Sequence, residues 1–145
     1  QAFGDKHQLF LKSLKYYMEQ SFKEVAASAY LHDSPMANLR SLLNEITARC
    51  IKGEGCMIVN ALVEMAPHDQ EVKQMIDQSY GMKQRFLTEL IDRAQRAGEI
   101  SIQQEPGRLA AVLMVALAGL ATTVKGFSNT DYIGYVLDDV LSSWE

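Results

Sequence analysis

The residues best suited to chemistry in this sequence are two cysteines, Cys50 and Cys56, which lie six positions apart. The turn between them contains Gly53 and Gly55, a spacing that suits no zinc knuckle, and the sequence supplies no second pair of cysteines. Cys56 follows Gly55 at the predicted start of a helix, where the positive end of the helix dipole favours a thiolate. The sequence therefore presents Cys56 as either a reactive thiol or a small buried residue, and it favours a core position for Cys50.

The histidines and the known catalytic motifs give no sign of an enzyme. His7, His32 and His68 lie at predicted helix ends or in loops, and none has a paired acid or nucleophile at a recognisable spacing. The sequence contains no glycine-rich phosphate loop, no H-E-x-x-H and no G-x-S-x-G. Glu64 lies one residue too far from His68 for the Glu-x-x-His of a di-iron bundle, and Pro67 interrupts that helix. We therefore expect no catalytic residue, no metal site and no cofactor.

Methionine, aromatic and polar side chains set among apolar helical positions indicate a ligand pocket instead. Methionines adapt to irregular shapes, and a few polar groups in an apolar lining orient a ligand. Gly81, in the middle of the longest predicted helix, would leave room for a small molecule. Such a pocket suits a small hydrophobic or amphipathic ligand, although the same stripes are also typical of plain core packing. The pocket residues that we expect are Tyr17, Phe22, Cys56, Asn60, Ser79, Met82, Phe86 and Met114.

Composition and charge restrict the classes of protein to which the chain can belong. Of its 145 residues, 48% are hydrophobic and 22% are charged, which fits one globular domain and neither a disordered nor a membrane protein. The longest apolar run, Leu109 to Val124, is shorter than the roughly 20 residues that cross a bilayer. The net charge of −4 is opposite in sign to that of a nucleic-acid-binding surface. With two cysteines and no export signal, we expect a reduced, cytoplasmic protein that does not bind membranes.

Hydrophobic periodicity predicts an all-α fold of about six helices. Asp5, Ser34 and Asp69 are suited to cap the N-termini of helices, and Gly98 is suited to the left-handed position that ends one. No convincing strand pattern is present. The predicted helices span residues 5–25, 35–50, 56–66, 69–97, 106–126 and 128–144, and Ser128 or Thr130 caps the last of them.

The last two predicted helices carry more apolar surface than a chain end normally exposes. Alanines and Gly119 would let another helix approach closely, although glycine in a helix interior costs about 1 kcal/mol relative to alanine. The pattern fits either a buried core helix or a subunit interface. The interface residues that we expect are Leu109, Val112, Leu113, Ala116, Gly119, Leu120, Tyr132, Val136 and Val140.

Residues 3–10, residues 55–72 and residues 108–120 form three recognisable stretches of the sequence. Together they resemble the TetR/AcrR family of transcriptional regulators. Residues 3–10 (FGDKHQLF) resemble the segment that joins the recognition helix of that family to the first helix of its ligand-binding body. Residues 55–60 (GCMIVN) and 66–72 (APHDQEV) are similar to a pattern of one large branch, and residues 108–120 resemble the dimerisation helix. The order and spacing of these stretches cover nearly the whole chain.

The resemblance implies a homodimer whose N-terminal helix-turn-helix domain, upstream of residue 1, binds operator DNA. Residues 1–4 would be the tail of that domain, and residues 5–145 would be the ligand-binding and dimerisation domain. Its last two long helices would form a four-helix bundle with the partner subunit. Lys6 matches a lysine of the family that contacts a DNA phosphate, and Cys56 matches a redox-sensing cysteine of an electrophile-responsive branch.

The function that the resemblance implies is a repressor that leaves its operator when a small-molecule effector binds. The effector would be a small, mainly hydrophobic ligand or an electrophile, and its binding would change the spacing of the two recognition helices. The alternative is a helical dimeric adaptor or scaffold that does not bind DNA. A helix-turn-helix encoded immediately upstream of Gln1 would exclude that alternative.

Overall fold

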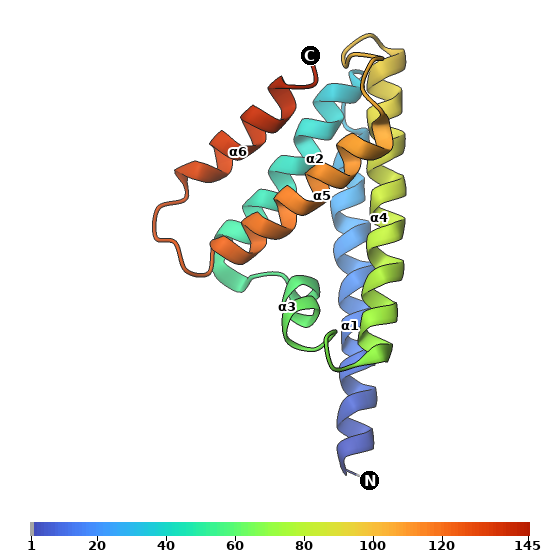
Figure 1. The fold of residues 1–145 in the computed structure, drawn as a ribbon, viewed down its shortest axis with the longest axis vertical. Coiled ribbons are helices and arrows are strands. Elements are labelled where there is room, and N and C mark those ends of the chain that lie inside the picture. The colour runs from blue at the N-terminus through green and yellow to red at the C-terminus, as the bar shows by residue number, and fades with distance from the viewer. Residues whose placement is uncertain (1) are drawn as a thin grey trace.

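The computed structural model describes residues 2–145 as a bundle of six α-helices (Figure 1). The described residues contain no β-strand, which confirms the predicted all-α fold. A 3-10 turn, Ser28–Tyr30, follows the first helix, and a π-helical turn, Cys50–Glu54, follows the second. The helices are α1 (Ala2–Ala27), α2 (Pro35–Arg49), α3 (Met57–Glu64), α4 (Gln70–Arg96), α5 (Pro106–Thr123) and α6 (Asp131–Ser142).

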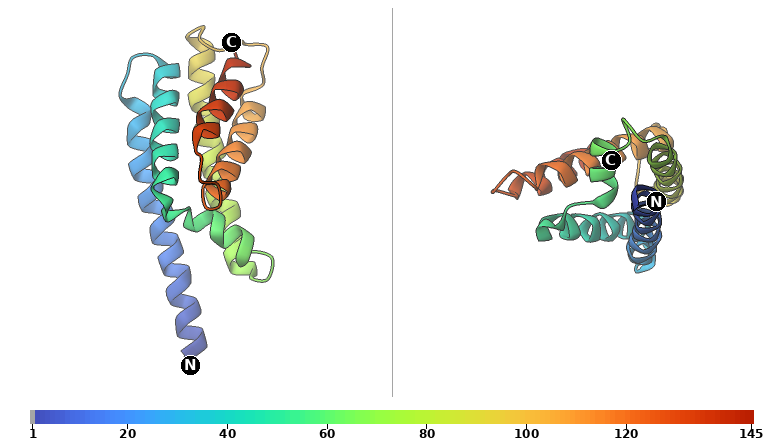
Figure 2. Two further views of the ribbon diagram at one scale, coloured as in Figure 1. Left: turned by 90° about the vertical axis from the view of Figure 1, so that its left-hand side faces the viewer. Right: turned by 90° about the horizontal axis from the view of Figure 1, so that it is seen from below.

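The two longest helices, α1 and α4, run side by side along the long axis of the molecule (Figures 1 and 2). With 26 and 27 residues, each is about 40 Å long at about 1.5 Å per residue. Helix α5 packs along α4, α2 lies against both long helices, and α6 lies on α5. The N-terminal end of α1 projects beyond the other helices (Figure 1).

Three capping predictions are confirmed. The Ser34 hydroxyl accepts a hydrogen bond of 3.0 Å from a backbone N–H in the first turn of α2. Asp69 Oδ1 accepts hydrogen bonds of 3.1 Å from two backbone N–H groups in the first turn of α4. Gly98 follows the end of α4 with φ of 75°, a conformation that favours glycine. These caps set the ends of the helices that carry most of the core.

One predicted cap is wrong, and a second is correct in position but makes no capping hydrogen bond. Helix α1 is already helical at Ala2, so Asp5 lies inside the helix and not at its N-cap. Thr130 precedes α6, but its side chain makes no capping hydrogen bond. Asn129 replaces it, because its Oδ1 atom accepts a hydrogen bond of 2.9 Å from Asp131 N. In both cases the residue type is suitable for a cap, but the adjacent residues determine where the helix begins and which side chain caps it.

The apolar core among the described residues has three clusters, of which two lie along α4 and a small third one consists of Cys50, Val59 and Ala121. The larger cluster surrounds Leu90 and Ile91 and joins α2, α4, α5 and α6, with Trp144 buried at its edge. The other cluster along α4 surrounds Val72 and Ile76 and joins α1, α3 and the first half of α4. The middle of α4 therefore lies between two separately packed regions.

Helix α5 is apolar enough to resemble a membrane span, since its 18 residues have a mean hydropathy of 1.5. At about 1.5 Å per residue it is about 27 Å long, slightly less than the hydrocarbon thickness of about 30 Å. Leu109, Leu113 and Leu120 of this helix are buried in the larger core cluster. We therefore interpret α5 as the core helix of the bundle.

Candidate ligand-binding site

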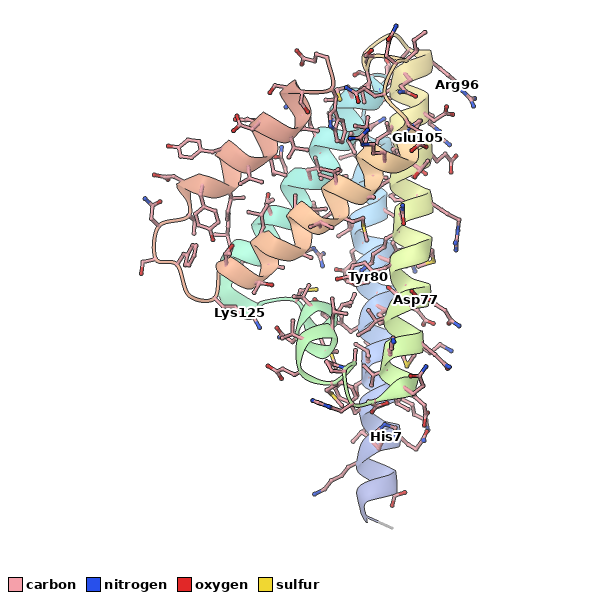
Figure 3. The ribbon with its side chains drawn as sticks, in the orientation of Figure 1. His7, Asp77, Tyr80, Arg96, Glu105 and Lys125 are labelled. Carbon is pink, nitrogen blue, oxygen red and sulfur yellow. The ribbon has the colours of Figure 1, made fainter. Side chains whose placement is uncertain are left out.

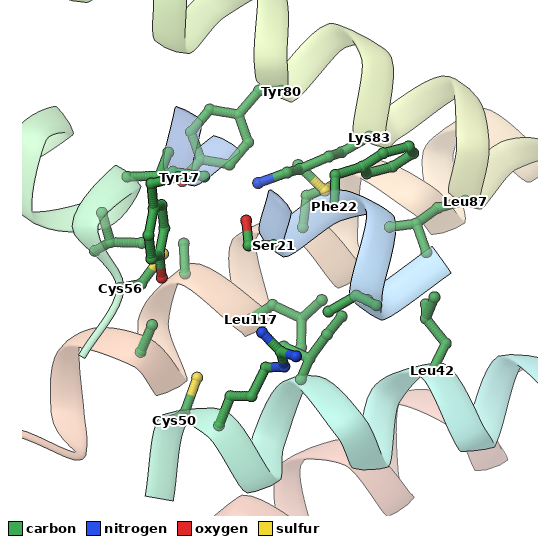
Figure 4. Close-up of a pocket in the computed structure, with 18 of the residues that line it drawn as sticks. Tyr17, Ser21, Phe22, Leu42, Cys50, Cys56, Tyr80, Lys83, Leu87 and Leu117 are labelled. Carbon is green, nitrogen blue, oxygen red and sulfur yellow. The ribbon is translucent and has the colours of Figure 1, made fainter. Parts of the chain in front are cut away.

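A cavity of about 150 Å³ lies where α1, α2, α4 and α5 meet the segment that begins α3 (Figure 4). Its lining includes residues of both core clusters along α4, so it occupies the gap between them. Apolar cavities of similar volume bind benzene. The space therefore fits a molecule about the size of one aromatic ring.

Helical spacing brings the lining side chains together. Ser21 and Phe22 lie four and five residues after Tyr17 on α1, and Tyr80 and Lys83 lie three residues apart on α4. Figure 4 shows that Tyr17, Ser21 and Lys83 border the same space. Two long helices thus supply the polar groups of a cavity whose remaining lining is mainly apolar.

The turn between α2 and α3 positions Cys56. The π-helical turn is followed by Gly55, whose φ of 70° favours glycine. A Cβ atom at this position would lie 3.0 Å from the Cε atom of Lys125, so a side chain here would also be crowded. Cys56 follows in an extended conformation at the N-cap of α3, and its thiol makes no capping hydrogen bond. This arrangement confirms the predicted helix start and places Cys56 on the cavity wall.

Five of the expected pocket residues line the cavity, namely Tyr17, Phe22, Cys56, Phe86 and Met114. The rings of Phe22 and Phe86 meet edge to face, with their centroids 5.2 Å apart. This is a favourable arrangement for aromatic pairs, and it forms one wall of the cavity from α1 and α4.

Three expected pocket residues, and Gly81, lie elsewhere. The side-chain oxygen of Asn60 accepts a hydrogen bond from the Lys125 ammonium. Ser79 is buried away from the cavity lining, and Met82 is 40% exposed. Each of these two precedes a lining residue by one position, and one residue turns a helix by about 100°. Gly81 borders a shallow hollow on the outer surface of α4.

Two cationic lining residues, Arg49 and Lys83, were missing from the expected pocket. Charged side chains are normally expected to face solvent, so neither residue was expected in the pocket. The spacing along α4 nevertheless carries a signal. Lys83 lies seven residues after Ile76 and four before Leu87, and both of these residues are buried. Lys83 therefore occupies a position in the row of side chains that faces the core.

Burial governs the ionisable groups around the cavity. Loss of solvent raises the pKa of the Tyr17 and Tyr80 hydroxyls and of the Cys50 thiol, and the nearby Cys56 thiol raises each further. The same loss of solvent lowers the pKa of the Lys83 ammonium, an effect that Cys56 partly opposes. Burial in the cavity wall therefore favours the neutral forms of Tyr17, Tyr80, Cys50 and Lys83.

The two cations of the cavity differ in their partners. Arg49 forms ion pairs with Glu24 at 2.5 Å and with Glu45 at 2.9 Å, and these hydrogen bonds raise its pKa. Lys83 forms no ion pair with a carboxylate among the described residues, and its Nζ atom lies 5.7 Å from the centroid of the Tyr80 ring. The positive charge of Lys83 is therefore the one that the cavity wall leaves without a counter-ion.

His7, which lies toward the projecting end of α1 (Figure 3), contacts Asp69 at the start of α4. The His7 Nε2 and Asp69 Oδ2 atoms are 2.7 Å apart. The pKa of Asp69 is lowered, first by the hydrogen bond from Val72 N and then by the one from His7. Lys6, the predicted phosphate contact, immediately precedes His7 and is exposed.

The interface residues expected on α5 and α6 divide into two groups. Leu109, Leu113 and Leu120 are buried in the core of this chain, which corrects their assignment to the partner-facing surface. Because α5 is apolar on nearly all sides, its sequence does not distinguish the core side from the outer side. Val112 and Gly119 are exposed. The other expected residues, Ala116, Tyr132, Val136 and Val140, are partly exposed.

Comparison with known protein families identifies the family to which this fold belongs. The profile of the tetracycline repressor-like C-terminal domain matches residues 35–139, which is most of the chain. The chain belongs to this family. It is thus a TetR-type regulatory domain, and the sequence resemblance is confirmed at the level of the family and the fold.

A solved structure has the same fold as this TetR-type domain. It is a double cysteine mutant of the TetR family transcriptional regulator CifR in complex with a 26-base-pair operator DNA. The two chains superpose with a TM-score of 0.82, and the match covers 99% of this chain and 77% of that one at 24% identity. Comparison with curated protein sequences gave no match.

We predict that Cys56 of this TetR-type domain reacts with iodoacetamide faster than Cys50. Cys56 is partly exposed on the cavity wall, whereas Cys50 is buried and has a raised pKa, which reduces its thiolate fraction. Mass spectrometry near neutral pH should show alkylation at least about ten-fold faster in Cys50→Ser than in Cys56→Ser. Equal rates in the two single-thiol variants would contradict this assignment.

Proposed function

We propose that this chain is the effector-sensing and dimerising domain of a TetR-type DNA-binding regulator. The full-length protein would be a cytoplasmic repressor, released from its operator by a small, mainly hydrophobic ligand or by an electrophile. Residues 1–4 would end the DNA-binding domain, and residues 5–145 would form the sensing domain. The observation that carries the proposal is a mainly apolar cavity placed against α1 in a TetR-type fold.

Helix α1 is the element that would connect the cavity to DNA. Tyr17 and Phe22 of α1 line the cavity, and the same helix continues to the projecting end that carries Lys6. The contact of His7 with Asp69 would keep this end in place relative to α4. An effector can change operator affinity only by binding one arrangement of α1 more tightly than another.

Cys56 is the residue through which an electrophile would act. Its thiol lies on the cavity wall and is partly exposed. The thiol would lose its proton to solvent, and the thiolate would add to the β-carbon of an α,β-unsaturated carbonyl compound such as a quinone. The carbon–carbon π bond would break as the carbon–sulfur bond forms, and the resulting enolate would take a proton from solvent. The same position makes Cys56 the candidate redox-sensing residue.

The exposed apolar residues of α5 and α6 would form the dimer interface. Val112 and Val115 are 48% and 73% exposed, and a Cβ atom at Gly119 would meet nothing within 4 Å. Two copies of this surface would cover each other as a four-helix bundle, with Gly119 allowing close approach. We define the α5–α6 face as Val112, Val115, Ala116, Gly119, Tyr132, Val136 and Val140.

The dimer proposal predicts that Val115→Glu produces monomers. A carboxylate buried in the α5–α6 face would lack a partner, so the dissociation constant of the dimer should rise by about 100-fold or more. Analytical ultracentrifugation of the full-length protein measures this change. Val63→Glu places the same charge at an exposed position on α3 and should leave the dimer intact. A dimer of unchanged affinity in Val115→Glu would refute the proposed interface.

The sensing proposal predicts that a compound bound in the cavity weakens operator binding by the full-length protein. The operator would be a DNA fragment selected by this protein from random sequence, and the compound a one-ring molecule found by thermal-shift screening. In Ala118→Phe a ring fills the cavity, so we expect fluorescence anisotropy to show operator binding that the compound no longer weakens. The exposed Ala27→Phe is the matched control and should respond like the wild type.

Equal operator affinity of the wild type with and without every compound that binds would refute the sensing proposal. Loss of the response in both Ala118→Phe and Ala27→Phe would also count against it, because the response would then not depend on the cavity.

A further inference from the structure

Lys83 occupies a core-facing position without a counter-ion. It follows Val72 and Ile76 and precedes Leu87 in the buried row of α4, and its side chain is directed into the cavity (Figure 4). Removing an ammonium group from water is unfavourable unless a partner offsets the loss. The Tyr80 ring, 5.7 Å away, offers only a cation–π contact.

Lys73 and Arg85 of α4 also form no ion pair with a carboxylate among the described residues, but both are exposed to solvent, whereas Lys83 is half-buried. Arg93 and Arg96 of α4 each pair with an acid four residues earlier, at 2.6 Å in both cases. The positions four residues before and after Lys83 hold Ser79 and Leu87. Arg49, the other cation of the cavity, is already paired with two glutamates. The lining of the cavity contains no carboxylate, so it would repel a cationic ligand and leave Lys83 unpaired around a neutral one.

We propose that the ligand of this cavity is a small carboxylic acid, whose carboxylate pairs with the Lys83 ammonium and whose apolar body fills the remaining space. The inference rests on the proposed sensing function and adds the chemical class of the effector. The volume of about 150 Å³ limits the body to about one ring or a short branched chain. Phe22 and Phe86 form an aromatic wall for that body.

The neighbouring hydroxyl groups suit the same ligand. Ser21 borders the space into which Lys83 points, and Tyr17 and Tyr80 also line it (Figure 4). Burial raises the pKa of both tyrosines, so their hydroxyls keep their protons and remain hydrogen-bond donors near neutral pH. A carboxylate accepts hydrogen bonds only, and the two tyrosine hydroxyls can donate them. The Ser21 hydroxyl donates to the Met18 carbonyl oxygen at 3.4 Å and would have to rotate to donate to the ligand.

Matched pairs of acids and amides test this proposal. The probes are benzoate with benzamide, phenylacetate with phenylacetamide, and cyclohexanecarboxylate with cyclohexanecarboxamide, each titrated calorimetrically into the full-length protein. The members of a pair have nearly the same shape and differ in charge. We expect at least one acid to bind about ten-fold or more tightly than its amide, since a charge-assisted hydrogen bond is about twice as strong as a neutral one.

Lys83→Met keeps an unbranched side chain and removes the charge. It should weaken binding of the acid by about ten-fold or more and leave binding of the amide unchanged or stronger. Lys73→Met makes the same change at an exposed position of α4 and should bind the acid like the wild type. The comparison of acid with amide in the wild type tests the proposal even if the Lys83 variant does not fold.

The outcomes separate this inference from the proposed function. Amides that bind as tightly as their acids, or acid binding that survives in Lys83→Met, would overturn the carboxylate assignment and leave a neutral effector in the same cavity. Failure of all acids and all amides to bind would overturn the assignment as well. The sensing function itself would fall only if compounds that do bind in the cavity left operator affinity unchanged.

Discussion

Burial of one side of α4 is the interaction on which this domain depends. Four other helices pack on α4, and its buried side chains belong to the two core clusters along it. The aliphatic row is continuous at each end of the helix, at Val72 and Ile76 and again from Leu87 onward. Between these positions Tyr80 and Lys83 turn toward the cavity. The gap in the apolar row is therefore the origin of the candidate site.

A ligand bound in a cavity between two separately packed clusters would affect the stability of the domain. A compound in this space would contact the cluster around Leu90 and the one around Ile76 at the same time, and α1 lies against it through Tyr17 and Phe22. Binding only to the folded state adds RT ln(1 + [L]/Kd) to the free energy of unfolding. The arrangement can therefore transmit occupancy to α1, because α1 forms part of the wall and also carries the projecting end of the domain.

Local signals in the sequence predicted the helices well. Ser34, Asp69 and Gly98 act as expected, because caps and left-handed positions depend on a few neighbouring residues. Asp5 fails because α1 is already helical before it, which no local preference reveals. Three motifs that span the chain indicated the family, because they occur together in the order and spacing expected for it and the second one is fairly specific.

The candidate site was predicted less completely, for geometric reasons. Ser79 and Met82 are each one residue away from a lining position, and hydrophobic spacing does not resolve that rotation. Leu113 was expected at the interface but belongs to the core. The sequence did not show this, because α5 has no polar side from which its orientation could be predicted. Lys83 was missed because a charged residue was assumed to face water, although its spacing from Ile76 and Leu87 places it on the buried row.

The most direct test concerns the claim that Lys83 serves a ligand and not the fold. The measurement is the free energy of unfolding of the Lys83→Met variant of the full-length protein, obtained by chemical denaturation without ligand. Methionine in the buried row removes an unpaired charge, so we expect the variant to be more stable than the wild type by about 1 kcal/mol. The exposed Lys73→Met should show no such gain. A Lys83→Met protein less stable than the wild type would contradict the claim, because Lys83 would then stabilise the fold itself.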